Sequence, residues 1–247
     1  MVAFSVTLSV AMSVIHLAGP SAASALRCDP ADAALVSVSA PAAGDVPAPA
    51  RDSALVALFE SGKPWTEFLA AAEARRAQWL ENAARPLAPA DAVARARALP
   101  GRWRLLVVAV DSCSDSVNTI PYLAQLVAQV PQLDLRVISP TVGRAVMEAR
   151  RTPDGRAATP TVVILDATGT EVGCWIERPA ALQSIAMEAG AGGGTPAFAS
   201  RKASWYAEDA GRSTVAEVVA LLERAAAGAR GCDAGAGSSR QEDGLWR

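Results

Sequence analysis

A nearly continuous apolar run from Arg104 to Val110, with the sequence RLLVVAV, constrains the fold more than any other segment of this chain. Such a run of β-branched and leucine residues without alternation is typical of a strand that is buried on both faces. The polar stretch 111–116 follows, and apolar residues then recur at helical spacing from Ile120 to Val130. A buried strand that leads directly into a helix predicts an α/β domain with a parallel βαβ unit.

The segments that follow extend this unit into a mixed sheet. Strands are predicted over 133–139, 161–166 and 171–177, a short helix over 141–150, and a last helix over 214–227 with Ser213 as its N-cap. The turn at 167–169 joins the last two strands into an antiparallel hairpin. Apolar stripes in 55–80 and 90–99 predict an N-terminal helical extension. We therefore expect a mixed central sheet, formed by a βαβ unit, a β-hairpin and a C-terminal helix, with helices on both faces.

The two ends of the chain differ in composition from the domain predicted at 51–227. Residues 26–50 have the Ala- and Pro-rich composition of a linker, and residues 228–247 predict a disordered tail. Residues 1–25 predict a signal peptide, because an uncharged apolar stretch precedes a pattern of small residues that ends at Ala25. This indicates a secreted or periplasmic protein. Because no Lys or Arg precedes the apolar stretch, an unexported leader on a cytoplasmic protein is the alternative. No segment predicts a stable membrane span.

Charge and histidine content exclude several classes of function. The chain carries 23 basic and 25 acidic side chains, which argues against a nucleic-acid-binding protein. Its single histidine, His16, lies in the predicted signal peptide, so a His-based catalytic triad or a His-rich metal site in the domain is excluded. The four cysteines, Cys28, Cys113, Cys174 and Cys232, form no CxxC pair, which excludes a zinc ribbon. The sequence indicates neither a metal nor a cofactor.

Cys113 is the candidate for chemistry, because it lies just past the first predicted strand and at the start of a helix. Free backbone N–H groups and the helix dipole favour a thiolate at this position. Ser116 has the helical spacing needed to donate a hydroxyl hydrogen bond to that sulfur. Thr159-Pro160 precedes a predicted strand, and a proline there is a candidate for a cis peptide bond. A small buried cysteine at a strand end is the alternative interpretation of Cys113.

Three segments together resemble the thioredoxin superfamily: Asp111-Ser-Cys-Ser-Asp-Ser116, Pro121 inside the following helix, and Thr159-Pro160-Thr161 before a strand. More narrowly, the stretch from Cys113 to Leu123 resembles a bacterial thioredoxin-like family whose motif runs Cys-x-Asp-Ser and continues Asn-Thr-x-Pro-Tyr-Leu. The resemblance implies a thioredoxin-like fold.

The same resemblance implies roles for individual residues. Cys113 matches the nucleophile, Pro160 matches the cis-proline that faces it, and Thr159 and Ser112 match substrate-binding positions. Ser116 stands where dithiol enzymes of the superfamily carry their resolving cysteine. This departure weakens a dithiol mechanism, because a hydroxyl cannot expel a mixed disulfide.

Three functions remain open. Cys113 acts as a monothiol on a protein or small molecule that carries a thiol or disulfide, or the domain binds partners without catalysis, or Cys174 serves as a remote resolving cysteine. Cys28 and Cys232 flank the domain, and a disulfide between them would tie its ends together in an oxidising compartment. That pairing would leave Cys113 and Cys174 as the interior cysteines.

Overall fold

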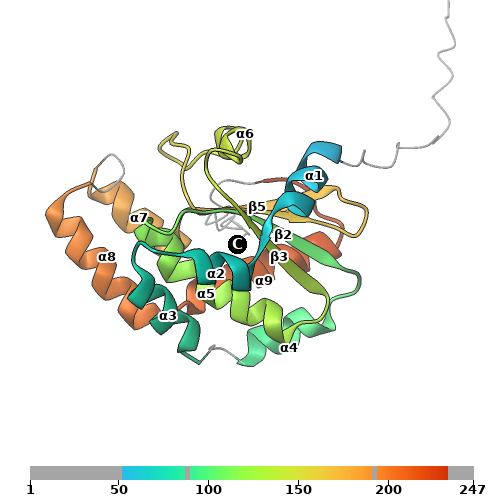
Figure 1. Ribbon diagram of the computed structural model, residues 1–247, viewed down its shortest axis with the longest axis horizontal. Helices are drawn as coiled ribbons and strands as arrows, with labels where there is room; N and C mark the ends of the chain where they lie inside the picture. The colour runs from blue at the N-terminus through green and yellow to red at the C-terminus, as the bar shows by residue number, and fades with distance from the viewer. Residues whose placement is uncertain (1–51, 87–89, 191–193, 233–247) are drawn as a thin grey trace, which may run out of the picture. The chain divides into compact units, whose positions relative to one another are not determined.

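The computed structural model describes residues 52–86, 90–190 and 194–232 (Figure 1). The predicted signal peptide, the linker and residues 233–247 of the predicted tail lie outside this part. The described elements are, in chain order, α1 (Ser53–Ser61), β1 (Lys63–Pro64), α2 (Trp65–Ala71), α3 (Arg76–Ala84), α4 (Ala90–Ala98), β2 (Trp103–Val108), α5 (Ser114–Gln129), β3 (Leu133–Ile138), α6 (Arg144–Glu148), β4 (Thr161–Leu165), β5 (Glu171–Ile176), α7 (Ala180–Glu188), α8 (Pro196–Asp209) and α9 (Arg212–Ala226).

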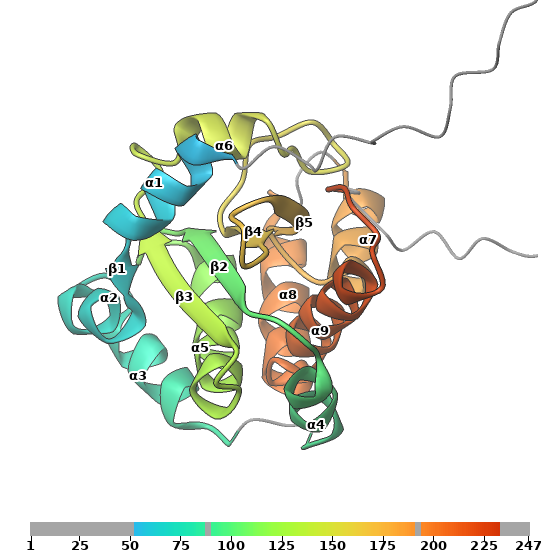
Figure 2. The same ribbon diagram turned by 90° about the vertical axis from the view of Figure 1, so that its right-hand side faces the viewer.

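The strands form one five-stranded mixed sheet in the order β1-β3-β2-β4-β5, which can be followed in Figure 2. β2 and β3 are parallel and are joined through α5, whereas β4 runs antiparallel to both β2 and β5. The predicted combination of a βαβ unit, a hairpin and a C-terminal helix is therefore confirmed. β1 is an addition that the sequence did not indicate; its two residues pair antiparallel with β3.

The central strand β2 is buried on both faces, as its apolar sequence predicts. Leu106 and Val108 point to the side covered by α1 and α6, where they pack with Phe59 of α1. Leu105 and Val107 point to the opposite side, into the larger cluster that α3, α4, α5 and α9 cover. These four side chains of β2 have no solvent exposure, which accounts for the absence of polar residues at their positions.

The last helix begins earlier than predicted, and Ser213 is not its N-cap. Gly211 occupies the cap position with φ +78°, a left-handed conformation that favours glycine. Ser213 lies inside the first turn and donates its hydroxyl to Asp209 Oδ1 at 2.6 Å. The reason is that the chain reverses between α8 and α9 at Gly211, where it packs directly on Tyr122 of α5.

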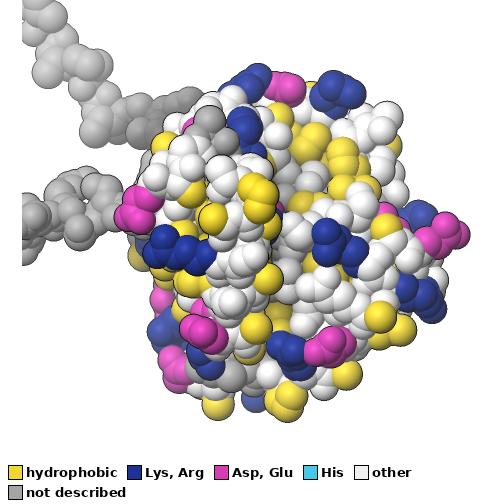
Figure 3. All heavy atoms as spheres, turned by 90° about the vertical axis from the view of Figure 1, so that its left-hand side faces the viewer, with side chains coloured by type: hydrophobic (Ala, Val, Ile, Leu, Met, Phe, Trp, Pro, Cys, Tyr) yellow, Lys and Arg dark blue, Asp and Glu magenta, His cyan; other side chains and the backbone are white. Residues whose placement is uncertain are grey.

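Two helices between β5 and α9 were not predicted. Thr195 caps α8 by accepting the Phe198 N–H at 3.2 Å, and Phe198 and Tyr206 pack with Leu182 of α7. On the side of the molecule that holds α8, basic and acidic side chains are interspersed (Figure 3).

Within the described ranges, no helix combines the length and the apolar character needed to cross a membrane.

Candidate active site

Cys113 lies where the sequence places it, between the carboxyl end of β2 and the start of α5. It is the N-cap residue of α5, and its sulfur accepts the Ser116 backbone N–H at 3.4 Å. The thiol donates to the Thr159 carbonyl oxygen at 3.2 Å. The Thr159–Pro160 peptide bond is cis, and Pro160 is buried. The fold thus brings Cys113, Ser116 and the Thr159-Pro160 turn together, and Cys113 is partly exposed.

Ser116 contacts the sulfur differently from the prediction. Its side chain has no solvent exposure, and its hydroxyl has no hydrogen-bond partner within the described residues. The backbone N–H makes the contact instead, because the first N–H groups of a helix lack partners within the helix and point back at the cap residue. The predicted hydroxyl bond to Cys113 is therefore wrong.

The turn before Cys113 is held by the connection between α2 and α3. Asp111 accepts the backbone N–H groups of Glu73 and Ala74 through Oδ2, each at 2.9 Å. The bond from Ala74, followed by the bond from Glu73, lowers the pKa of Asp111 below its usual value. Trp79 donates its indole N–H to the Asp111 carbonyl at 2.9 Å. The carbonyl of Ser112, whose side chain is exposed, accepts Arg75 Nε at 2.8 Å.

Asp115 is buried close to Cys113 in sequence, and its carboxylate is paired with residues far along the chain. Lys202 Nζ lies 3.0 Å from its Oδ2, and the Tyr206 hydroxyl donates to its Oδ1 at 2.8 Å. Lys202 also donates to Ser114 Oγ at 2.7 Å. Burial and then the Asp115 charge raise the pKa of Tyr206 well above its usual value. The negative charge of Asp115 is thus paired with the Lys202 cation and with a neutral hydroxyl donor.

A second charged group connects this cluster to the proline turn. The backbone N–H of Glu177 donates to the Pro160 carbonyl at 2.7 Å, and the Glu177 carboxylate is bonded to Arg178 and Arg156. The buried guanidinium of Arg178 also lies 3.6 Å from Asp115 Oδ2. The two sides of the site, the α5 start and the turn before β4, are therefore joined by one network of charges. No local sequence pattern indicated that these charged residues belong to the site.

The cysteine pairing differs from the expectation. Cys174 forms a disulfide with Cys232, and their Cα atoms are 4.9 Å apart. This contradicts a Cys28–Cys232 bond and removes Cys174 as a free resolving thiol; Cys28 itself lies outside the described residues. The reason is the course of the chain after α9, which returns along β5. A Cβ added at Gly173 would lie only 3.8 Å from the Gly231 carbonyl oxygen.

Within the described part of the chain, Cys113 is the free cysteine, and no three His, Cys, Asp or Glu side chains gather as metal ligands would. The arrangement therefore provides one sulfur, backbone donors and acceptors around it, and the Asp115 carboxylate, which is paired with Lys202. Chemically, such a site suits the attack of a single sulfur on a disulfide, or the binding of an extended backbone at Thr159.

Comparisons with known proteins agree with this architecture. A family model described as thioredoxin matches residues 62–191, which span β1 to α7 and exclude α8. A crystal structure of a protein of unknown function from Pseudomonas aeruginosa is similar, with 22% identity, a TM-score of 0.55, and coverage of 68% of this chain and 96% of that one. An HIV epitope scaffold has 21% identity, a TM-score of 0.53 and the same coverage. No curated protein matches the chain.

Proposed function

We propose that this chain, which belongs to the thioredoxin family, exchanges thiols and disulfides through the single sulfur of Cys113. The observation that carries the proposal is the position of that sulfur. It caps α5, accepts the Ser116 N–H and lies against the Thr159 carbonyl beside Pro160. Backbone N–H groups at a helix start stabilise negative charge on sulfur, and Cys113 is a partly exposed residue.

The reaction has two steps, and each conserves sulfur bonds and electrons. The Cys113 thiolate attacks one sulfur of a partner disulfide, a mixed disulfide forms, and the second partner sulfur leaves as a thiolate. An external thiol, a small thiol or a second protein thiol, then attacks the mixed disulfide, takes the partner sulfur and releases the Cys113 thiolate. This second step needs an external thiol because Ser116 has no sulfur and Cys174 is bonded to Cys232.

Within this proposal, Thr159 and Ser112 contact the partner. Ser112 has an exposed side chain, and Thr159 is the residue whose carbonyl already lies next to Cys113. The stretch from Cys113 to Leu123 supports membership of the narrower group with a Cys-x-Asp-Ser motif. Export is part of the proposal as well: residues 1–25 are a signal peptide, 26–50 a linker, and 51–227 the domain before the tail. The disulfide is compatible with an oxidising compartment.

The test is the rate at which Cys113 forms a mixed disulfide with oxidised glutathione. The protein carries Cys28→Ala, so that Cys113 is the remaining free thiol while the Cys174–Cys232 bond is intact. We expect the folded protein to react faster at neutral pH than the same protein denatured in guanidinium, as measured by mass spectrometry of quenched samples. Cys113→Ser in the same background gives the blank. A folded rate equal to or below the denatured rate contradicts the proposal.

A non-catalytic binding module is the second candidate, and one observation favours it. The Cys113 thiol donates a hydrogen bond to the Thr159 carbonyl, which occupies the sulfur when no partner is present. Affinity purification with Cys113→Ser separates the two functions. If the variant retains the same partners as the unmodified protein, the surface binds without the sulfur; if the partners are lost, the sulfur itself holds them.

A further inference from the structure

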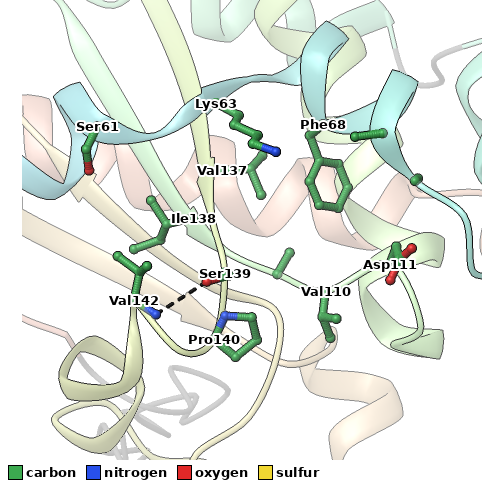
Figure 4. A pocket seen from close by; sticks show the side chains of 13 residues that line it. Ser61, Lys63, Phe68, Val110, Asp111, Val137, Ile138, Ser139, Pro140 and Val142 are labelled. Atoms are coloured by element: carbon green, nitrogen blue, oxygen red, sulfur yellow. Dashed lines mark hydrogen bonds between the residues drawn. The ribbon is translucent and has the colours of Figure 1, made fainter.

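A cavity of about 520 Å³ opens beside α2, where β2 and β3 end (Figure 4). Its floor is formed by Val110, which follows β2, and by Val137 and Ile138 of β3, while Phe68 of α2 forms one side. Cavities that bind small molecules measure about 300–1,000 Å³ and are lined mainly by apolar side chains. In α/β folds they occur preferentially outside the carboxyl ends of the parallel strands.

The walls of this cavity are held by the core beneath them. Val137 is 2% exposed and Ile138 is 5% exposed, so neither side chain is free to turn away. Phe68 packs edge-on against the buried ring of Trp79, with ring centroids 5.3 Å apart. The Ser139 hydroxyl already accepts the Val142 N–H, which holds the rim between β3 and α6. The apolar surface is thus preformed.

The charges around the cavity favour an anion with one charged end. Lys63 is the cation among its lining residues; its ammonium has no hydrogen-bond or ion-pair partner in the described part of the chain. In Figure 4 the Lys63 side chain extends over the cavity toward Phe68, while Asp111 lies at the other end. The Asp111 carboxylate is occupied by the backbone N–H groups of the α2–α3 connection. A negative charge is therefore favourable near Lys63 and unfavourable near Asp111.

We propose that this cavity binds a small amphipathic monocarboxylate. Its carboxylate pairs with the Lys63 ammonium, and its aliphatic chain lies over Val110, Val137 and Ile138. Burial of the chain supplies most of the affinity, because its several buried methylenes together contribute more than one partly exposed ion pair. Lys63 and Asp111 set the direction in which the ligand lies. The site is distinct from the sulfur of Cys113 and goes beyond the proposed exchange reaction.

Octanoate is the probe, and methyl NMR of the full-length protein is the measurement. We expect saturable shifts of the Val110, Val137 and Ile138 methyl signals on titration with octanoate. Octanedioate, with a second carboxylate directed at Asp111, is expected to bind at least tenfold more weakly. Octylammonium is expected to bind more weakly than octanoate, because Lys63 repels it. Equal binding of octylammonium and octanoate, or the absence of saturable shifts with octanoate, overturns the proposal.

Two variants with a matched control localise the binding. Lys63→Met is expected to weaken octanoate binding about two- to fivefold, the contribution of one partly exposed ion pair. Ala71→Phe places a ring in the cavity from an exposed position at the end of α2 and is expected to abolish binding. Ala70→Phe is the control, because Ala70 is exposed on the same helix but does not line the cavity. Octanoate shifts that survive in Ala71→Phe, or that disappear equally in Ala70→Phe, refute the site.

Discussion

Removal of the Cys174–Cys232 disulfide should destabilise the protein by an amount that follows from its position in the chain. The bond joins residues separated by 58 positions, and closing a loop of that length in the unfolded chain corresponds to about 4 kcal/mol. Cys174 on β5 is buried, with 4% exposure, so its replacement by alanine also removes packing contacts of the sulfur. The double variant Cys174→Ala/Cys232→Ala is expected to lose about 4–5 kcal/mol of unfolding free energy, the upper part of the range for native disulfides.

Equilibrium urea unfolding, followed by tryptophan fluorescence, measures this loss. The unmodified protein should unfold at a lower urea concentration once a reductant has opened the bond, whereas the midpoint of the double variant should not respond to reductant. Cys113→Ala is the matched control, because it removes the free thiol and leaves the disulfide intact; its effect should stay well below that of the double variant. The loop-closure reasoning fails if the oxidised protein and the double variant unfold at the same urea concentration.

Two further predictions test the packing of α9 and the charges around the proline turn. Gly211→Ala should lower the free energy of unfolding, measured in urea, by about 2–5 kcal/mol, because its Cβ would lie 2.1 Å from Tyr122 Cγ and its φ is +78°. Gly101 has φ +85° and open space around it, so Gly101→Ala should lower this free energy by only about 1–2 kcal/mol. Equal losses in the two variants would contradict the packing argument. The guanidinium of Arg156 lowers the pKa of Asp154 to about 2 from 3.8, so this carboxylate stabilises the folded protein above about pH 4 and stops doing so as the pH falls toward 2. Asp154→Asn should therefore be less stable than the unmodified protein at neutral pH, and it should lose less stability between pH 4 and pH 2. The unfolding midpoint of both proteins, measured as a function of pH, tests this. Identical pH profiles would exclude the contribution of Asp154.

The sheet could be predicted from the sequence because its signals are local. The apolar run 104–110, the turn at 167–169 and the helical stripe after Cys113 each lie within one or two elements. The placement of Cys113 beside Thr159 required the family resemblance, since 46 residues separate them. In that part of the site, the resemblance supplied the long-range information that periodicity lacks.

The residues behind Cys113 could not be predicted in this way. Lys202 and Tyr206 lie on α8, whose apolar face is narrow and whose sequence is largely alanine and charged residues. Such a helix gives a weak periodic signal, although its stability comes from packing on α7. The pairing of Cys174 with Cys232 was missed for a related reason. Spacing along the chain does not report distance in space, and the return of the chain along β5 depends on how α9 packs.

The distance along the chain between Asp115 and its partners has a consequence for biosynthesis. Asp115 leaves the ribosome 87 residues ahead of Lys202 and 91 ahead of Tyr206. Until those residues emerge, the nascent polypeptide holds a carboxylate that is costly to dehydrate, and a buried ion that lacks its partner costs about 3–5 kcal/mol. Burial of the amino end of α5 is therefore favourable only after α8 has emerged. A nascent chain that is released before position 202 would lack both these partners of Asp115 and α9, which covers one face of the sheet.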